Sequence, residues 1–501
     1  MKNQVQLITY VDRFGGGTLA ELRELLSGPL AGVFGGVHLL PFFHRIDGAD
    51  AGFDPIDHTQ VDARLGGWED VAALAREVDV MADVIVNHMS SESPQFLDFS
   101  ARGSASPYNG LFLSFDTVFP HGATESDLLA LYRPRPGLPL TVTPLANGEK
   151  RLLWTTFTPQ QMDIDVDHPA GKAYLGAILQ VLAANGVSMV RLDAIGYAVK
   201  EAGKSGFMMP KTFAFIAAFA AGARALGLEV LLEIHSYYKT QIEIARQVDR
   251  VYDFALPPLV LHALAFGTAA PLLAWLAQRP TNAVTVLDTH DGIGIIDIGA
   301  DTADRQGRPG LVPAAELDRL VEIIHEKSSG QSRRATGAAA SNLDLYQVNC
   351  TFYDALGRDD VAYLLARAVQ FFVPGVPQVY YVGLLAGEND MELLAKSGSG
   401  RDINRHYFSR EEVHTALKRP VVQRLLELVR WRNTHPAFGG HFEARADGAA
   451  GLVLVWQHNE HRATLNVDLR QKRGHITFSG AQGETVWAIG EPVSQPQVQS
   501  A

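Results

Sequence analysis

The stretch YLGAILQVLAANGVSMVRLDAI (174–195) contains two patterns that together decide the fold. In its first part, 174–184, apolar residues recur at i, i+3 and i+4 spacing, which predicts an amphipathic helix. Its second part, VSMVRLDAI (187–195), is a short apolar run with β-branched residues, which predicts a strand. A helix followed at once by a strand is the repeating unit of a parallel α/β fold.

The same alternation continues over most of the chain. Further helical patterns lie at 19–26, 212–226 and 420–435. Eight parallel strands are the number that closes a (β/α)₈ TIM-type barrel, and we therefore predict an α/β fold of that type. The eight candidate strands are 6–12, 36–43, 79–88, 187–195, 228–235, 250–257, 283–291 and 376–383.

Two intervals between candidate strands, after 88 and after 291, are too long for simple connections and predict inserted subdomains. Period-two segments at 451–458, 462–469 and 483–490 predict a small C-terminal all-β domain. Residues 131–141 and 328–342, rich in Pro, Gly, Ser or Ala, are expected to be mobile surface loops. The predicted division is a catalytic barrel at 1–86, 168–292 and 358–437, subdomain B at 87–167, subdomain B′ at 293–357 and the β domain at 438–501.

The composition restricts the class of protein. A chain of 501 residues with 47% hydrophobic residues has ample material for a large core. Its net charge of -12, without a Lys/Arg-rich run, disfavours nucleic acid and anionic membranes as partners. The single cysteine, Cys350, excludes an intramolecular disulfide and favours a reducing compartment. No export signal or membrane span is recognisable, so we expect a cytoplasmic protein.

Polar residues stand at the carboxyl ends of four candidate strands, where a parallel barrel places its active site. Because residues two apart on a strand point to the same face, the pairs on the fourth and fifth strands should project into one cleft. Three carboxylates, Asp193, Glu233 and Asp291, are then expected to converge. The strand-end residues are Asp83, Asn87 and His88; Arg191 and Asp193; Glu233 and His235; and His290 and Asp291.

Such a group of carboxylates suits the cleavage of a glycosidic bond. Cleavage with retention needs a carboxylate nucleophile and a carboxylic acid about 5 Å away. A third carboxylate can stabilise the positive charge of the transition state. We expect Arg191 to lower the pKa of Asp193 and keep it ionised, while the apolar run before Glu233 suits a proton donor. A purely structural Arg191–Asp193 ion pair is the alternative that spacing leaves open.

At these residues the chain resembles the α-amylase-type glycoside hydrolases. The family pattern is matched, in order, by DVIVNH (83–88), GVSMVRLDA (186–194), LLEIH (231–235) and LDTHD (287–291). Within that group the chain is similar to the sucrose phosphorylase family over nearly its whole length. The stretches that carry this narrower resemblance are GADAGFDPIDH (48–58), FTPQQMDID (157–165), LDTHDGIG (287–294), SNLDLYQVN (341–349) and GRDINRHY (400–407).

The resemblance implies a role for each site residue. It makes Asp193 the nucleophile, Glu233 the general acid/base and Asp291 the transition-state stabiliser. It places His235 among the substrate-binding residues. The implied glucose subsite is Asp50, Phe53, His88, Phe157, Arg191, His290 and Arg401, and the implied acceptor subsite is Arg135, Asp344, Leu345, Tyr346 and Gln347.

The activity that the resemblance implies is transfer of glucosyl from sucrose to inorganic phosphate, with release of fructose. Neutral fructose and anionic phosphate must then use one subsite, and two loops could exchange Arg135 and Asp344 there. No cofactor is implied, because phosphate is a co-substrate. No structural metal is expected, although Asn87 lies where many relatives in the wider group place a calcium ligand. A homodimer is compatible with the resemblance.

Several other functions fit the same scaffold. A hydrolase or a transglucosylase would share the first half-reaction and differ only in its acceptor. Related phosphorylases act on sucrose 6-phosphate, glucosylglycerol or glucosylglycerate. A catalytically inactive barrel could serve as a binding subunit, but such a chain would be expected to lack a catalytic carboxylate, and all three are present here.

Overall fold

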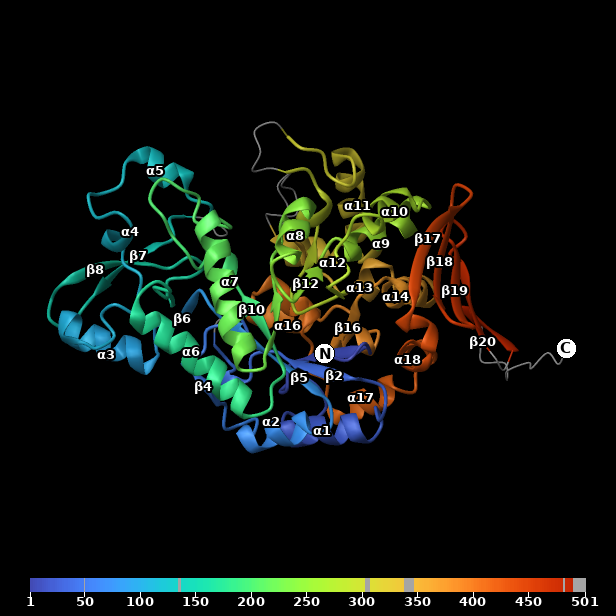
Figure 1. The fold of residues 1–501 in the computed structure, drawn as a ribbon, viewed down its shortest axis with the longest axis horizontal. Helices are drawn as coiled ribbons and strands as arrows, with labels where there is room; N and C mark the ends of the chain where they lie inside the picture. The colour runs from blue at the N-terminus through green and yellow to red at the C-terminus, as the bar shows by residue number, and fades with distance from the viewer. Residues whose placement is uncertain (49, 134–136, 302–306, 338–346, 481–482, 490–501) are drawn as a thin grey trace.

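The computed structural model describes residues 1–48, 50–133, 137–301, 307–337, 347–480 and 483–489. At its centre lies a closed barrel of eight parallel strands, in the order β1-β16-β13-β12-β11-β10-β5-β2 (Figure 1). The predicted barrel is therefore confirmed. The barrel strands are β1 (Gln6–Thr9), β2 (Gly36–Leu39), β5 (Asp79–Ile85), β10 (Met189–Asp193), β11 (Glu229–Leu232), β12 (Arg250–Asp253), β13 (Ala283–Thr285) and β16 (Val376–Tyr380).

Helices surround the barrel and bury their apolar faces against it. In α6 (Pro169–Ala184), for example, Leu175, Ile178, Leu179 and Leu182 are buried, at the spacing that the sequence predicts. The other helices of this ring are α1 (Leu19–Ser27), α2 (Trp68–Ala75), α7 (Pro210–Ala225), α8 (Tyr238–Ala245), α9 (Leu256–Phe266), α10 (Ala270–Leu276), α14 (Asp360–Phe372) and α18 (Pro420–Thr434).

All eight predicted barrel strands extend beyond the observed carboxyl ends, and in two of them an α-helix occupies the difference. The sixth was expected to reach residue 257, but β12 ends at Asp253 and α9 begins at Leu256. The proline pair in the first turn of α9 explains the difference, since proline lacks the N–H that the start of a helix leaves unpaired. Likewise the eighth strand ends at Tyr380, where α15 (Tyr381–Leu384) begins.

The segment between β5 and β10 projects to one side of the barrel, at the left of Figure 1. It has a small core of its own, formed by Leu113, Phe119, Leu131 and Trp154. Its last strand pairs antiparallel with β6, directly after the third barrel strand. The elements are β6 (His88–Ser90), α3 (Pro94–Arg102), α4 (Phe115–Val118), α5 (Glu125–Ala130), β7 (Leu140–Pro144), β8 (Lys150–Trp154) and β9 (Gln161–Asp163).

The segment between β13 and β16 begins and ends on a short antiparallel pair, β14 (Ile293–Gly294) and β15 (Gln347–Val348). Between them lie α11 (Ala314–Lys327) and α12 (Gln331–Thr336). The expectation of a mobile loop at 328–342 is thus wrong for residues 331–336, which form α12. Further elements of this region and the next are η3 (Ile296–Ile298), α13 (Phe352–Ala355), α16 (Met391–Ser397), η5 (Gly400–Asn404) and α17 (Arg410–Ala416).

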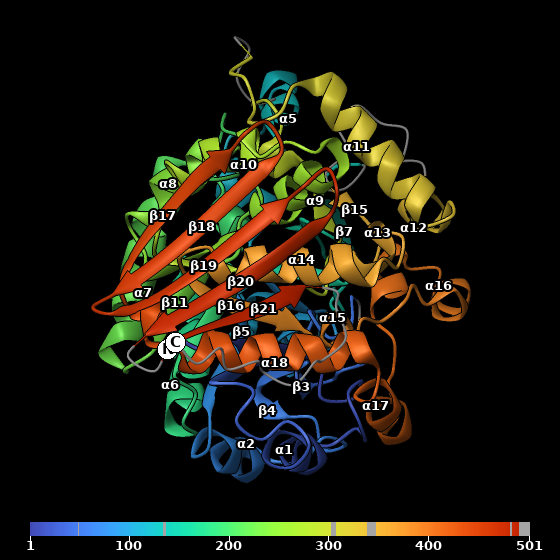
Figure 2. The same cartoon turned by 90° about the vertical axis from the view of Figure 1, so that its right-hand side faces the viewer.

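A five-stranded antiparallel sheet closes the chain, as predicted, and covers α14 and α18 (Figure 2). The Trp456 indole donates a hydrogen bond of 2.7 Å to the carbonyl of Phe372, at the end of α14. Trp431 of α18 stacks on Phe478 with ring centroids 4.6 Å apart. The strands are β17 (His441–Asp447), β18 (Gly451–His458), β19 (His461–Asp468), β20 (Arg473–Gly480) and β21 (Gly483–Ile489).

All eight barrel strands lie within the three ranges that we predict for the barrel domain, although the domain boundaries themselves stay a prediction. Among the helices that the structure describes, none is long and apolar enough to cross a membrane.

Candidate active site

One guanidinium joins the carboxylates at the carboxyl ends of three neighbouring strands. In the parallel register of β5 and β10, Arg191 lies opposite Asp83, and the two form a buried ion pair. Arg191 Nη1 is also 3.0 Å from Asp193 Oδ1, and its Nη2 is 3.7 Å from Glu233 Oε1, just beyond the end of β11. Asp193 and Glu233, the candidate nucleophile and acid, thus contact the same guanidinium. This arrangement fits the short distance between the two carboxyl groups of a retaining enzyme better than the roughly 6.5–9.5 Å of an inverting enzyme.

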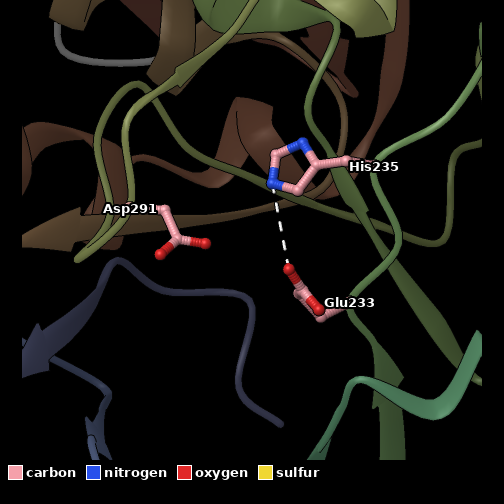
Figure 3. Close-up of side chains that lie close together, drawn as sticks. All are labelled: Glu233, His235 and Asp291. Atoms are coloured by element: carbon pink, nitrogen blue, oxygen red, sulfur yellow. Dashed lines mark ion pairs between the residues drawn. The ribbon is translucent and has the colours of Figure 1, made fainter. Parts of the chain in front are cut away.

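The third carboxylate, Asp291, faces Glu233 and His235 across a common space (Figure 3). One polar atom of each of these side chains lies within 4.8 Å of the others. Such a group could present ligand atoms to a cation, but it is also the arrangement that glycoside chemistry requires. The expectation of no structural metal stays a prediction.

The carboxylates of Asp291 and Asp50 form ion pairs within one group of charged residues, together with two arginines. Arg401 Nη1 lies 3.0 Å from Asp291 Oδ1 and 2.7 Å from Asp50 Oδ2. Arg405, which is wholly buried, reaches the other oxygen of Asp50 at 3.1 Å. Burial raises the pKa of Asp291, but nearby positive charge, that of Arg401 above all, outweighs burial and holds the pKa below its usual range. Asp291 is therefore an anion, as a transition-state stabiliser must be.

The expectation that Arg191 keeps the pKa of Asp193 below its usual range is wrong, because the pKa is raised. Arg191 does lower it, but burial raises it more, and the carboxylates of Glu233, Asp83 and Asp291 add to the increase. The reason is that Arg191 is shared with Asp83, whose own pKa it helps lower to about 2 against the effect of burial. The Asp193 carboxyl accordingly holds a proton more readily than an isolated carboxyl does.

The predicted glucose subsite is lined by stacked rings and neutral imidazoles. Phe53 stacks on His290 with centroids 4.7 Å apart, and the Arg191 guanidinium lies 5.5 Å above the Phe53 ring. His88 Nε2 is 2.9 Å from the carbonyl oxygen of Phe53, and its ring is 5.3 Å from that of Phe157. Burial lowers the pKa of His290 to about 3, so that it meets a substrate uncharged. Apolar rings with a few polar edges suit a sugar.

The predicted acceptor subsite is described only in part. Gln347 is the one member within the described residues, and its Nε2 atom lies 3.2 Å from His235 Nε2. Arg135, Asp344, Leu345 and Tyr346 lie outside the described residues. Their roles stay predictions that rest on the sequence.

A lysine ammonium lies between Asn87 and the carboxylate of Asp163. Lys200 Nζ is 3.2 Å from Asn87 Oδ1 and 3.0 Å from Asp163 Oδ2, and both Lys200 and Asp163 side chains are buried. The ammonium is also 5.6 Å from the Trp154 ring centroid. Lys200 thus supplies positive charge beside Asn87 from the chain itself.

Sequence reasoning missed several residues that complete the site. Arg405 lies within the quoted GRDINRHY stretch, and that position could have been noticed. His38, which lies 2.9 Å from Asp83, and Lys200 carry no pattern that separates them from other residues of their type. Asp297 is the other omission; it reaches His235 from a segment far along the chain.

A parallel barrel with three carboxylates and an arginine at the carboxyl ends of its strands, and with ring-lined walls, defines an enzyme that acts on glycosidic bonds. Known proteins that are similar to this chain agree with that class. Residues 32–221 match the model of the α-amylase catalytic domain.

Two curated relatives are both named sucrose phosphorylase. The one from Agrobacterium vitis is 60% identical, over 96% of this chain and 98% of its own. The one from Bifidobacterium adolescentis is 57% identical, over 95% of this chain and 93% of its own. The crystal structure of sucrose 6F-phosphate phosphorylase from Thermoanaerobacter thermosaccharolyticum superimposes with a TM-score of 0.90 at 36% identity, covering 98% of each chain. The chain belongs to the sucrose phosphorylase family, within the α-amylase group.

Proposed function

We propose that this protein is a sucrose phosphorylase, which transfers the glucosyl group of sucrose to inorganic phosphate with retention and releases fructose. The observation that carries the proposal is the group of Asp193, Glu233 and Asp291 around Arg191 and Arg401. It occurs in a chain that is 60% identical, over nearly its whole length, to the Agrobacterium vitis enzyme.

In the first half-reaction, Glu233 donates its proton to the glycosidic oxygen while an Asp193 oxygen attacks the anomeric carbon from the opposite face. Fructose leaves, and a β-glucosyl ester remains on Asp193. Arg191, 3.0 Å from Asp193, orients the attacking carboxylate. The anion of Asp291 stabilises the positive charge that develops on the sugar ring, and Arg401 holds that anion in place.

In the second half-reaction, a phosphate oxygen attacks the same carbon from the face that fructose left. The ester bond breaks, Asp193 recovers its carboxylate, and α-glucose 1-phosphate forms. Two inversions give net retention. Phosphate brings its own nucleophilic oxygen, whereas water must be deprotonated by Glu233 before it can attack, which gives phosphate an advantage over hydrolysis.

The wall residues support glucose as the transferred sugar. Phe53 and Phe157 offer apolar surfaces, while Asp50, Arg401 and His290 offer hydrogen-bonding groups to hydroxyls. Asp50 stays ionised, since Arg401 and Arg405 lower its pKa against the effect of burial. An ionised carboxylate beside an arginine is an arrangement that binds adjacent sugar hydroxyls well.

Donor competition tests this proposal against its nearest relatives. Sucrose, sucrose 6-phosphate, glucosylglycerol and glucosylglycerate are each supplied with phosphate, and formation of α-glucose 1-phosphate is followed. We expect the highest kcat/KM for sucrose. A higher value for one of the other donors would assign the chain to that phosphorylase instead, and no glucose 1-phosphate from any donor would reject the reaction class.

A further inference from the structure

Next to Glu233, a buried histidine and a buried aspartate form a close pair. His235 Nδ1 lies 2.7 Å from Asp297 Oδ2, with both side chains almost inaccessible to solvent. On its other edge, His235 Nε2 lies 3.8 Å from Glu233 Oε1. Figure 3 shows this edge of the imidazole directed toward Glu233 and the space in front of Asp291.

Asp297 is held in one position by donors from its surroundings. Its Oδ1 accepts a hydrogen bond of 2.7 Å from Gln241 Nε2 and one of 3.2 Å from the backbone N–H of Ser236. A Cβ at Gly294 would lie 2.2 Å from Asp297 Oδ2 and 3.0 Å from His235 Nδ1, so only glycine leaves room for the pair. With Oδ1 occupied by these two donors, Asp297 directs its Oδ2 at the imidazole of His235.

The surroundings of His235 favour the doubly protonated ring. Among the described residues, the carboxylates of Asp297, Glu233 and Asp291 oppose the effect of burial and leave the pKa of His235 raised. The ring also stacks on Phe254, with centroids 3.8 Å apart and planes 14° from parallel, and an aromatic face stabilises a cation. Gln347 Nε2 lies 3.2 Å from His235 Nε2. A doubly protonated ring requires the Gln347 amide to be turned over, so that its oxygen accepts from Nε2–H, since two donors cannot face each other.

We propose that Asp297 is a positioning residue which keeps His235 as an imidazolium, so that His235 Nε2–H supplies a fixed positive charge for the anionic acceptor beside Glu233. The inference rests on the proposed function. Its reason is electrostatic: once Glu233 has given its proton to the leaving fructose, it carries a negative charge in the space that phosphate must enter. A cation 3.8 Å away offsets that repulsion without moving any loop.

Asp297→Asn separates charge from geometry. The amide retains the size of the carboxylate and can donate to Nδ1, which favours the neutral ring with its proton on Nε2. His235 Nε2–H can still donate a hydrogen bond to phosphate, but the positive charge of the ring is lost. Because a hydrogen bond from a charged donor is roughly twice as strong as a neutral one, the KM for phosphate should rise about tenfold. Glucosyl transfer from sucrose to the enzyme, which needs no anion bound there, should change much less.

The pH dependence distinguishes this role from a merely structural one. In the native chain His235 stays charged above its ordinary range, and the charge is lost only as pH rises through the raised pKa. In Asp297→Asn the loss of charge comes at lower pH, so the KM for phosphate should begin to rise at lower pH than in the native protein. Lowering the pH should partly restore phosphate use. If Asp297→Asn is insoluble, Gly294→Ala serves in its place. The added methyl group crowds the His235–Asp297 pair, and the pH profile of the phosphate KM should shift in the same direction.

Asp253→Asn is the matched control. Asp253 is equally buried, on the neighbouring strand, but it accepts from Arg279 at 2.7 Å and Trp275 at 2.9 Å rather than from a site residue. The variant Asp253→Asn should leave the ratio of phosphate KM to sucrose KM unchanged. The pH dependence of that ratio should also stay as in the native protein. If Asp297→Asn behaves like this control, the assigned role is wrong.

A direct titration separates this inference from the proposed function. The ring proton signal of His235 is identified by its loss in His235→Gln and followed by NMR against pH, without substrate. A midpoint that falls in Asp297→Asn supports the assignment, and an unchanged midpoint overturns it. If the native protein made free glucose at saturating phosphate, the proposed function would fail, while the titration would still decide whether Asp297 holds the proton on His235.

Discussion

Replacing Lys200 by methionine should destabilise the protein far more than replacing a surface lysine. The ammonium is 3.0 Å from Asp163, and the two side chains are only 4% and 1% exposed. Methionine fills a similar volume but leaves a buried carboxylate without its cation, a loss that costs about 3–5 kcal/mol in other proteins.

The structure places the expected loss at the lower end of that range. Asp163 keeps hydrogen bonds from Asn87 Nδ2 at 3.0 Å and from the backbone N–H of Thr156 at 3.0 Å, and the Thr156 hydroxyl also donates to it. We therefore expect about 3 kcal/mol. The double variant Lys200→Met with Asp163→Asn removes the unpaired charge and should recover at least about 1 kcal/mol of that loss.

Urea unfolding, followed by tryptophan fluorescence, measures these differences as shifts of the transition midpoint. The matched control is Lys211→Met, because Lys211 forms a pair of 2.8 Å with Asp167 in which both side chains are more than half exposed. That pair is worth no more than about 1 kcal/mol. Equal losses in Lys200→Met and Lys211→Met, or no recovery in the double variant, would refute the reasoning about the buried ammonium.

The remaining predictions concern the reaction and its pH range. Asp193→Asn should abolish turnover, since the step has no other nucleophile, and near-native activity free of contamination would reject the role. Glu233→Gln should lose about 10²–10⁴-fold on sucrose but far less on α-glucosyl fluoride, whose leaving group needs no proton; equal losses would count against an acid role. Arg135→Ala should raise the KM for phosphate and increase free glucose, whereas an unchanged partition would leave Arg135 without that function. Asp83→Asn should make stability depend less on pH in the acid range. Asp83 has a pKa of about 2 in the folded chain, so its contribution to the free energy of unfolding is present above about pH 4 and is lost as pH falls toward 2. Urea unfolding midpoints between about pH 4 and 2 measure this difference.

The barrel could be predicted from the sequence because each of its strands is a separate apolar run beside an amphipathic helix. In β18, the predicted and observed limits coincide at Gly451–His458. The carboxyl ends of strands were harder to place, as at Leu256, because an apolar run continues from a strand into a buried helix without a change of composition. The strands β17 and β20 were missed; β17 is largely exposed and polar, and β20 begins with the exposed residues Arg473 and His475.

The catalytic group could be predicted because its members lie at or just beyond the carboxyl ends of β10, β11 and β13, and the closed barrel brings these ends together. How the charged groups of the site pair with one another, and how this shifts their pKa values, could not be predicted from the sequence. That Arg191 is shared between Asp83 and Asp193 depends on the register of β5 against β10, which spacing does not define. Asp297 and Lys200 were missed for the same reason, since each reaches its partner from a separate segment of chain.

The most direct test of the proposed function is product analysis with the native protein, sucrose and phosphate. At saturating phosphate, α-glucose 1-phosphate and fructose should form in equal amounts, and the α configuration should be visible in the first turnovers by NMR. Without phosphate, sucrose should be consumed much more slowly, with glucose as the product. Free glucose as the main product at saturating phosphate would make the enzyme a hydrolase, glucan or other transfer products would make it a transglucosylase, and β-glucose 1-phosphate would contradict a covalent intermediate on Asp193.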